Sequence, residues 1–332
     1  MTPGIGTIAS AILVFAGGSF LVAAIIAALY PVTQRWILGR HPGTRAGLLL
    51  VLACAPAVVA LVLLMLTLSP SLIHYLGLGS DHCQAHGHHA HFCLIHTPLL
   101  AGTSLERAIL SVAGIAMLIL FAAVAFRLRR VQRAVRALRA AQIAEPAHQP
   151  YSVVDSHTPF ALTVGLVKRT IYLSSRLRSE LSPTELMAVV AHEQAHCRRH
   201  DALRMFVADL MSWLHLPPLR RRLLADLHLA SEQSCDEQAA LTTGDRLGVA
   251  ETILKVVRLN AATDRNSDIL LPTMTGSDVH VRVDALLHPA PTGSGAPRAV
   301  ALVGAGLLFA FGFTHADGLH HAVESVIHLF ID

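Results

Sequence analysis

The sequence predicts an α-helical membrane protein with an inserted α+β domain. Hydrophobic residues make up 53% of the 332 residues, charged residues only 14%, and the mean hydropathy is +0.53, all outside the usual range for a soluble domain. Long apolar segments occupy residues 5–30, 46–68 and 108–126. Residues 151–297 instead contain Pro and Gly breaks between short strand-like and helix-like segments, which favours a small sheet followed by helices.

The three apolar segments are long enough, or nearly so, to cross a hydrocarbon core of about 30 Å at about 1.5 Å per residue. A fourth apolar segment covers only residues 299–313. Fifteen residues make a marginal span, so a short fourth transmembrane helix and a buried or re-entrant helix are both open for this segment.

Arginine distribution predicts the orientation of the spans. Three arginines follow the first span and six lie between residues 127 and 139, whereas residues 69–104 and the tail after residue 313 contain no Lys or Arg. Because basic loops stay on the cytoplasmic side, we expect a multi-pass protein of the cell membrane with residues 69–104 and the tail outside. No basic residue precedes Arg35, so the first span is expected to remain as an anchor with its N-terminus outside.

These features predict four parts of the chain. Residues 1–126 are expected to hold three transmembrane helices and the extracytoplasmic loop 69–104, and residues 127–150 a basic juxtamembrane linker. Residues 151–297 are expected to form a cytoplasmic domain. Residues 298–332 are expected to form the short fourth transmembrane helix and an extracytoplasmic tail.

The central motif of the cytoplasmic part lies on a predicted helix. Residues 151–155, 159–164 and 170–173 have the composition of short strands. After them, Ser182, Pro183 and Glu185 form a capping-box pattern that predicts a helix start. Ten residues beyond Ser182 this helix would carry the run from His192 to His196.

His192, Glu193 and His196 have the His-Glu-x-x-His spacing of zinc peptidases. Residues four apart share a helix face, so both imidazoles can bind one zinc ion from one side. Glu193 beside them can take a proton from a water molecule activated by the metal and pass it to a leaving amine. The alternative is a chance match, because the chain contains 21 histidines.

A three-ligand zinc site needs one more protein ligand, and Glu232 is the candidate. It lies in a segment of strong helix formers, and Asp236 follows one turn later. Asp236 is positioned to accept a hydrogen bond from a zinc-bound imidazole, which would fix the ring tautomer. The alternative for both acids is a solvated helix face.

In the order of its motifs the chain resembles the BlaR/MecR family of membrane-embedded zinc metallopeptidases. The similar elements are residues 159–165, 170–173, 182–186, 192–201 and the Cys235-Asp236-Glu237 run. The resemblance implies a zincin-like (gluzincin) fold, His192, His196 and Glu232 as Zn2+ ligands, Glu193 as the catalytic carboxylate and Asp236 as a supporting residue. The sequence has no Ser-x-x-Lys motif and only about twenty residues after the fourth apolar segment, so we expect neither the penicillin-binding sensor domain of antibiotic-sensing members nor acylation by a beta-lactam.

A second candidate metal site lies in the predicted outer loop. Imidazole and thiolate side chains suit zinc, copper or nickel, and Cys/His-rich tracts are typical of metal binding. A disulfide between the two cysteines is the alternative reading of the same tract. The candidate residues are His82, Cys83, His86, His88, His89, His91 and Cys93.

The predicted function is hydrolysis of peptide bonds in a cytoplasmic protein, in signal transduction such as inactivation of a transcriptional repressor. Residues 160–164 are the candidate edge strand for binding substrate backbone. Alternatives are an extracytoplasmic metal-binding receptor or carrier on a non-proteolytic scaffold, and a housekeeping membrane protease. The expected partners are a protein substrate and the lipid bilayer. Direct nucleic-acid binding is not expected, because the arginines cluster at predicted membrane edges, and the oligomeric state is not indicated.

Overall fold

A computed structural model describes residues 4–77, 103–143, 149–263, 276–288 and 314–328. Three long helices contain the predicted spans: α1 (Gly4–Leu38), α2 (Pro42–Tyr75) and α3 (Ser104–Ala140). Each is long and apolar enough to cross a membrane, and little of each apolar stretch is covered by protein. These helices associate the chain with a membrane. The last turns of α3 include residues 127–140 of the predicted basic linker.

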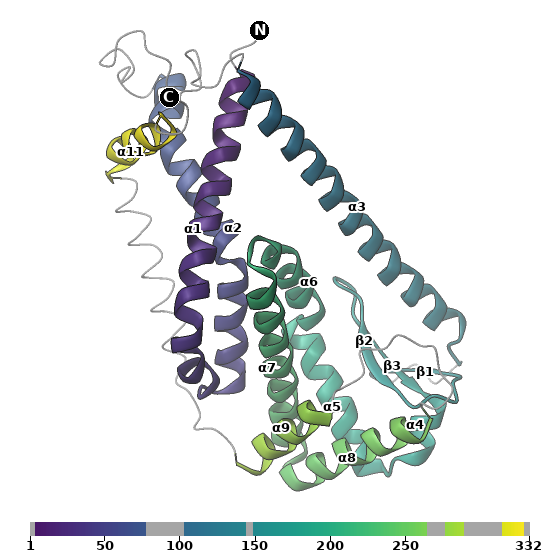
Figure 1. The fold of residues 1–332 in the computed structure, drawn as a ribbon. Coiled ribbons are helices and arrows are strands. Elements are labelled where there is room, and N and C mark those ends of the chain that lie inside the picture. The colour runs from purple at the N-terminus through teal and green to yellow at the C-terminus, as the bar shows by residue number, and fades with distance from the viewer. Residues whose placement is uncertain (1–3, 78–102, 144–148, 264–275, 289–313, 329–332) are drawn as a thin grey trace.

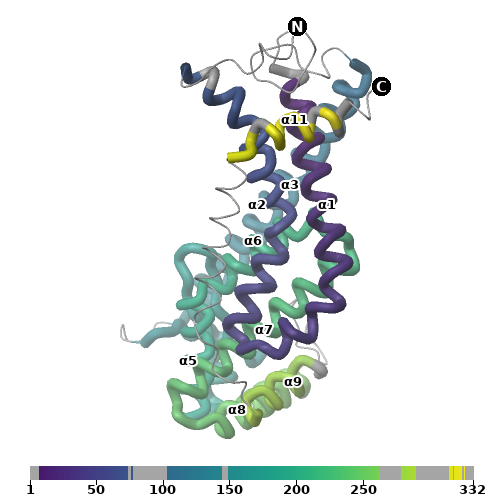
Figure 2. Tube along the Cα trace, turned by 90° about the vertical axis from the view of Figure 1, so that its left-hand side faces the viewer, coloured from purple at the N-terminus to yellow at the C-terminus, as the bar shows by residue number. Residues whose placement is uncertain are grey.

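The long helices form an open arrangement (Figure 1). α1 and α2 lie side by side as an antiparallel pair, whereas α3 diverges from them toward the sheet. A further helix, α11 (Ala316–His328), packs against the far end of α2 (Figure 2). The ring of His320 is buried there, with Nδ1 2.8 Å from the carbonyl oxygen of Thr67. This histidine of the predicted outer tail therefore binds the α2 backbone.

The sheet has three strands, and all three were predicted. β1 (Ser152–Val154) is parallel to β3 (Thr170–Ser174), and β2 (Ala161–Val164) is antiparallel to it, in the order β1-β3-β2. β2 is thus an edge strand. The turn after it requires Gly165, whose φ is 111° and whose Cβ, if present, would lie 2.1 Å from the carbonyl oxygen of Lys168.

The other described residues after the sheet form mainly helices. The predicted capping box of Ser182 and Glu185 is present at the start of the motif helix. His200, in the left-handed conformation with φ 59°, ends that helix and turns the chain directly into the next. The elements are α4 (Ser175–Glu180), α5 (Pro183–Arg199), α6 (Asp201–Met211), the 3-10 turn η2 (Ser212–Leu214), α7 (Pro217–Thr243), α8 (Arg246–Thr263) and α9 (Gly276–Leu287).

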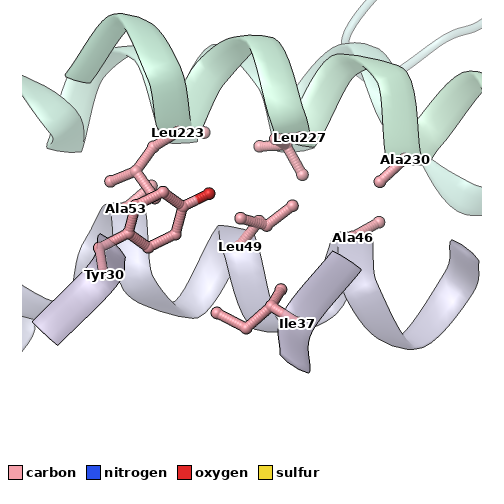
Figure 3. Close-up of a cluster of buried hydrophobic side chains, with 9 residues drawn as sticks. Tyr30, Ile37, Ala46, Leu49, Ala53, Leu223, Leu227 and Ala230 are labelled. Atoms are coloured by element: carbon pink, nitrogen blue, oxygen red, sulfur yellow. The ribbon is translucent and has the colours of Figure 1, made fainter. Parts of the chain in front are cut away.

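The largest buried cluster joins α7 to the membrane helices (Figure 3). Leu223 and Leu227 of α7 pack on Leu49 of α2 and Tyr30 of α1. The Tyr30 hydroxyl also donates a 2.5 Å hydrogen bond to Asp226. α7 therefore shares a core with the ends of α1 and α2, a contact that the sequence did not predict.

A second cluster holds the motif helix against α7. Ala188 and Ala191 of α5 meet Ala239 and Ala240 of α7, with α8 and α9 closing the cluster. Small side chains let the two helix backbones approach closely. This contact brings the His192 face of α5 toward α7.

Several predicted features lie outside the described residues: the candidate span 299–313, the residues 289–298 before it, and the whole outer-loop set of His82, Cys83, His86, His88, His89, His91 and Cys93.

Candidate metal centre

Two imidazole rings on α5 define the centre. The Nε2 atoms of His192 and His196 lie 3.1 Å apart, with the rings at 76° to each other. The i, i+4 spacing explains the geometry, since it stacks both rings on one helix face. Each ring therefore directs the same nitrogen toward one point.

Glu232 approaches from α7. Its carboxylate oxygens lie 3.6 Å from His192 Nε2 and 3.4 Å from His196 Nε2. His192, His196 and Glu232 form a group whose ligand atoms all lie within 4.8 Å of one another. The packing of α5 on α7 thus brings the three predicted ligands together, although Glu232 lies 40 residues after His192 in the sequence.

These three residues fit a zinc ion. Tetrahedral bonds of about 2.0–2.2 Å place neighbouring ligand atoms about 3.3–3.6 Å apart, close to the separations observed here. In addition, Glu232 Oε2 is buried and has no hydrogen-bond partner among the described residues, although it faces Arg282. Since Arg282 already supplies one cation to this oxygen, the fit to zinc depends on the ligand set, two imidazoles and one carboxylate, which is typical of catalytic zinc sites.

Outer carboxylates hold both rings. His192 Nδ1 lies 2.9 Å from Asp236 Oδ1, and His196 Nδ1 lies 3.0 Å from Asp201 Oδ2. With a proton on each Nδ1, both Nε2 lone pairs face the centre. Asp236 is thus placed where it was predicted. Asp201 is a partner that the sequence analysis did not assign, although it immediately follows the helix end.

Arg282 is a further residue that the sequence analysis missed. It comes from α9 and is 3% exposed. Its guanidinium donates two hydrogen bonds to Asp236, at 2.8 and 2.7 Å, and lies 2.9 Å from Glu232. The side chain therefore ties together one predicted ligand and the acid that supports His192. No spacing relates it to the motif, so only tertiary structure shows this role.

The charges of the centre are strongly coupled. Burial alone lowers the pKa of His192 and His196, but hydrogen bonds to the neighbouring acids outweigh it, so both pKa values are raised, that of His196 strongly. Burial alone raises the pKa of Glu232, yet hydrogen bonds to both rings and the charge of Arg282 hold it well below its usual value. Glu232 is therefore ionised and able to compensate a bound cation.

Glu193 lies on the same helix turn and is held by the sheet. The Thr163 hydroxyl lies 2.8 Å from Glu193 Oε2 and 3.1 Å from the Glu193 carbonyl oxygen. Thr163 belongs to the edge strand β2, so one side chain links that strand to the predicted catalytic carboxylate. A single hydroxyl proton can serve only one of these two oxygens at a time.

A cavity of about 810 Å³ joins the centre to the sheet edge. His192, Glu193, His196 and Glu232 contribute to its wall. β2 lines one side of it, and apolar residues of α5 and α8 line another, including Val189, Ile253 and Val256. The candidate ligands and a strand edge thus line one space that is large enough for peptide side chains.

A second group of side chains with metal-ligand chemistry adjoins the first. Cys235 Sγ lies 3.4 Å from both His196 Nδ1 and Asp201 Oδ2, and these three residues form a close group. Burial raises the pKa of the Cys235 thiol to about 11, so the thiol is protonated in the metal-free protein. His196 Nδ1 and Asp201 are also already paired with each other. This group therefore serves to orient His196.

Comparison with known proteins places the chain in a family. No curated protein and no solved structure matches it. A family model described as BlaR1 peptidase M56 matches residues 93–286, more than half of the chain, from before α3 to the end of α9. The matched region contains every residue of the centre described above, Arg282 included. The chain therefore belongs to the BlaR1 peptidase M56 family of membrane-associated metallopeptidases.

Proposed function

We propose that the protein is a membrane-embedded zinc endopeptidase that hydrolyses peptide bonds of a cytoplasmic protein. The observation that carries the proposal is the convergence of His192, His196 and Glu232 at zinc-ligand separations beside Glu193 in one cavity. Zinc dependence is also general among M56 metallopeptidases.

Glu193 performs the proton transfers in this proposal. His192, His196 and Glu232 would hold the zinc ion, which would supply a Lewis acid at the peptide carbonyl and at water. The Glu193 carboxylate accepts a proton from the attacking water and delivers it to the nitrogen of the leaving amine. The hydroxyl of Thr163 orients this carboxylate through its hydrogen bond to Oε2.

The edge strand supports binding of an extended peptide. β2 pairs with β3 on one side only among the described strands, and its residues line the cavity next to Glu193. A substrate backbone added to this edge would pass beside the candidate zinc ligands. Val189, Ile253 and Val256 would then surround an apolar substrate side chain.

The proposed role is in signal transduction, and the predicted orientation supports a substrate on the cytoplasmic side. The Arg-rich ends of the helices favour a cytoplasmic position for residues 151–297, so the proposed substrate is a cytoplasmic protein such as a transcriptional repressor. The lipid bilayer is the second proposed partner. Direct nucleic-acid binding is not part of the proposal.

Replacing the carboxylate by an amide tests the proposal. Glu193→Gln removes the proton acceptor but none of the three ligands, so we expect peptide hydrolysis to be lost while one zinc per chain is retained. Activity would be measured on reconstituted protein, and the metal by elemental analysis. Glu251→Gln, at an exposed position of α8, is the control and should leave both unchanged.

The E193Q and E251Q variants can also identify the substrate. Protein fragments that accumulate in cells expressing wild-type or E251Q protein, but not E193Q, identify it by mass spectrometry. Undiminished hydrolysis by E193Q would contradict the assignment of Glu193.

A further inference from the structure

The turn between α6 and α7 exposes apolar side chains. Trp213 is 50% exposed, Leu214 37% and Leu216 51%. These three residues are nearly consecutive and belong to η2 and the short connection that follows it. A cluster of this kind on a protein that also crosses a membrane calls for a covering partner.

Contacts with α2 give the level of this turn relative to the membrane. The buried ring of His215 places Nε2 3.1 Å from the carbonyl oxygen of Leu52, and η2 also packs against α1 and α2. From Leu52 the apolar part of α2 continues to Ile73. That stretch is about 32 Å long at about 1.5 Å per residue, which matches the hydrocarbon thickness of about 30 Å. The α2 residues just before Leu52 are apolar too, but Ala46 and Leu49 among them pack on α7, so a hydrocarbon core that ends near Leu52 leaves this packing outside the bilayer.

Contacts with α3 indicate the same position of this turn relative to the membrane. Arg127 is the first basic residue after the apolar stretch of α3, directly after Phe126. Its guanidinium pairs with Asp209 of α6 and lies 5.9 Å from the centroid of the Trp213 ring. Arg127 at the end of the apolar stretch of α3 and Leu52 of α2 therefore both contact the turn between α6 and α7. In Figure 1 this turn lies well inside the length of α1 and α2.

The charge around the turn suits anionic lipid. Arg220 lies 5.5 Å from the Trp213 ring centroid, and Arg221 and Arg222 follow it as exposed residues in the first turns of α7. Tryptophan is enriched at the interface between hydrocarbon and headgroups. Basic side chains at this depth are attracted to the phosphates of anionic lipids.

We propose that residues 212–216, with Arg221 and Arg222, form a membrane-contact site whose partner is an anionic phospholipid bilayer. Trp213 and Leu216 enter the interfacial layer of the leaflet on the side of the sheet, and the two arginines bind lipid phosphates. Since α7 also carries Glu232, this contact fixes the metal centre at a set distance from the membrane surface.

Tryptophan quenching by brominated lipids tests the proposal on the full chain in vesicles. The protein has two tryptophans, so Trp36→Phe leaves Trp213 as the only fluorophore and Trp213→Phe leaves Trp36. We expect bromines near the headgroup end of the acyl chain to quench Trp213 about twofold or more, and bromines at the chain terminus to quench it less. Trp36, near the turn joining α1 and α2 and beyond Leu52, should respond weakly to both.

Lipid charge is tested with the same fluorophore. In W36F protein, a small fraction of brominated phosphatidylglycerol should quench Trp213 more than the same fraction of brominated phosphatidylcholine. Arg221→Gln with Arg222→Gln should abolish this difference. Lys168→Gln with Arg258→Gln removes equal charge from exposed positions on other elements and should preserve it.

Two results would overturn the inference. Strong quenching of Trp213 by aqueous iodide, with none by brominated lipid, would show that the turn faces water. Protection from both quenchers would show that protein covers it instead. Neither result bears on zinc content or on hydrolysis, so the proposed peptidase activity stands or falls separately.

Discussion

Arg282 lies at the meeting point of two acids in the centre. It donates two hydrogen bonds to Asp236 and lies within ion-pair distance of Glu232, so it positions the support of His192 and one ligand at once. Its planar guanidinium matches the geometry of Asp236, which a lysine ammonium cannot reproduce. Arg282 also lines the cavity, and it positions the centre through Asp236 and Glu232.

Substituting Arg282 should weaken the metal site. Arg282→Met leaves Asp236 and Glu232 buried without their cation, and loss of such outer contacts lowers zinc affinity or activity by about 10–100-fold. Arg282→Lys should restore part of the zinc affinity because it returns the charge. Competition with a chelator measures affinity, and kcat/KM measures activity. Wild-type affinity in R282M would contradict the role, and Arg258→Met, at an exposed position, serves as the control.

Zinc binding should release protons. The neighbouring carboxylates raise the pKa of His192 and His196 in the metal-free protein, so these rings hold protons there to higher pH than free histidine. Zinc requires neutral imidazole, and its apparent affinity should therefore fall as pH falls below the raised pKa values. Titration calorimetry in two buffers of different ionisation enthalpy counts the protons. Equal heats in both buffers would contradict the prediction.

The residues of the centre differ in how far the sequence predicts them. His192, Glu193 and His196 are local, because helix geometry alone places side chains four apart on one face. Predicting Glu232 as the third ligand required the resemblance to the family as well as the helix-forming composition around it. The role of Arg282 depends on the packing of α9 against α7, and no residue spacing in the sequence indicates that packing.

α7 connects the metal centre to the membrane helices. Leu223 and Leu227 face α1 and α2, and Glu232 lies about one turn farther along the same helix. Gln233 extends this connection, since its side chain bonds to Arg45 of α2 and, at 3.0 Å, to the carbonyl oxygen of Val281 on α9. α7 thus contacts α1, α2 and α9 close to the metal centre.

Truncating a buried side chain of α7 should destabilise this arrangement. Leu227→Ala leaves a cavity against α2 and should cost about 2–5 kcal/mol of folding stability, with loss of zinc at lower temperature than wild type. Thermal unfolding in detergent, followed by circular dichroism and zinc release, measures both. Leu241→Ala, on the same helix but 64% exposed, is the matched control. An unchanged midpoint for L227A would contradict the packing.

At the scale of elements, the three strands and the start of α5 could be predicted from the sequence, whereas the full length of α1 and α2 could not. Alternating Val, Thr and aromatic residues predict β1 to β3, and the capping box predicts the start of α5. Hydropathy identifies only the bilayer part of α1 and α2. The end of α1 beyond residue 30, which includes Ile37, belongs to the buried cluster with α7, and this packing is tertiary information.

Across the whole molecule, the family match and the hydrophobic core do not coincide. The match begins at residue 93, whereas the core beneath α7 is completed by α1 and α2. Membrane helices therefore stabilise the part of the chain that carries the metal centre. The widely separated α3 in Figure 1 contributes instead through Arg127, at the α6–α7 turn.

The fold class follows from composition, because apolar segments of bilayer length have few alternatives. The direct packing of residues 217–230 on the membrane helices could not be predicted. It depends on which faces of two separate amphipathic segments meet, and helical periodicity gives only each face by itself.

X-ray absorption spectroscopy of zinc in the purified full chain tests the central claim most directly. We predict one zinc per chain with nitrogen and oxygen ligands at about 2.0–2.2 Å, including two imidazoles, and loss of this signal in Glu232→Ala protein. A sulfur ligand at about 2.3 Å would place the ion at Cys235 instead, and the absence of stoichiometric zinc would leave the centre without a metal. Either result would contradict the account.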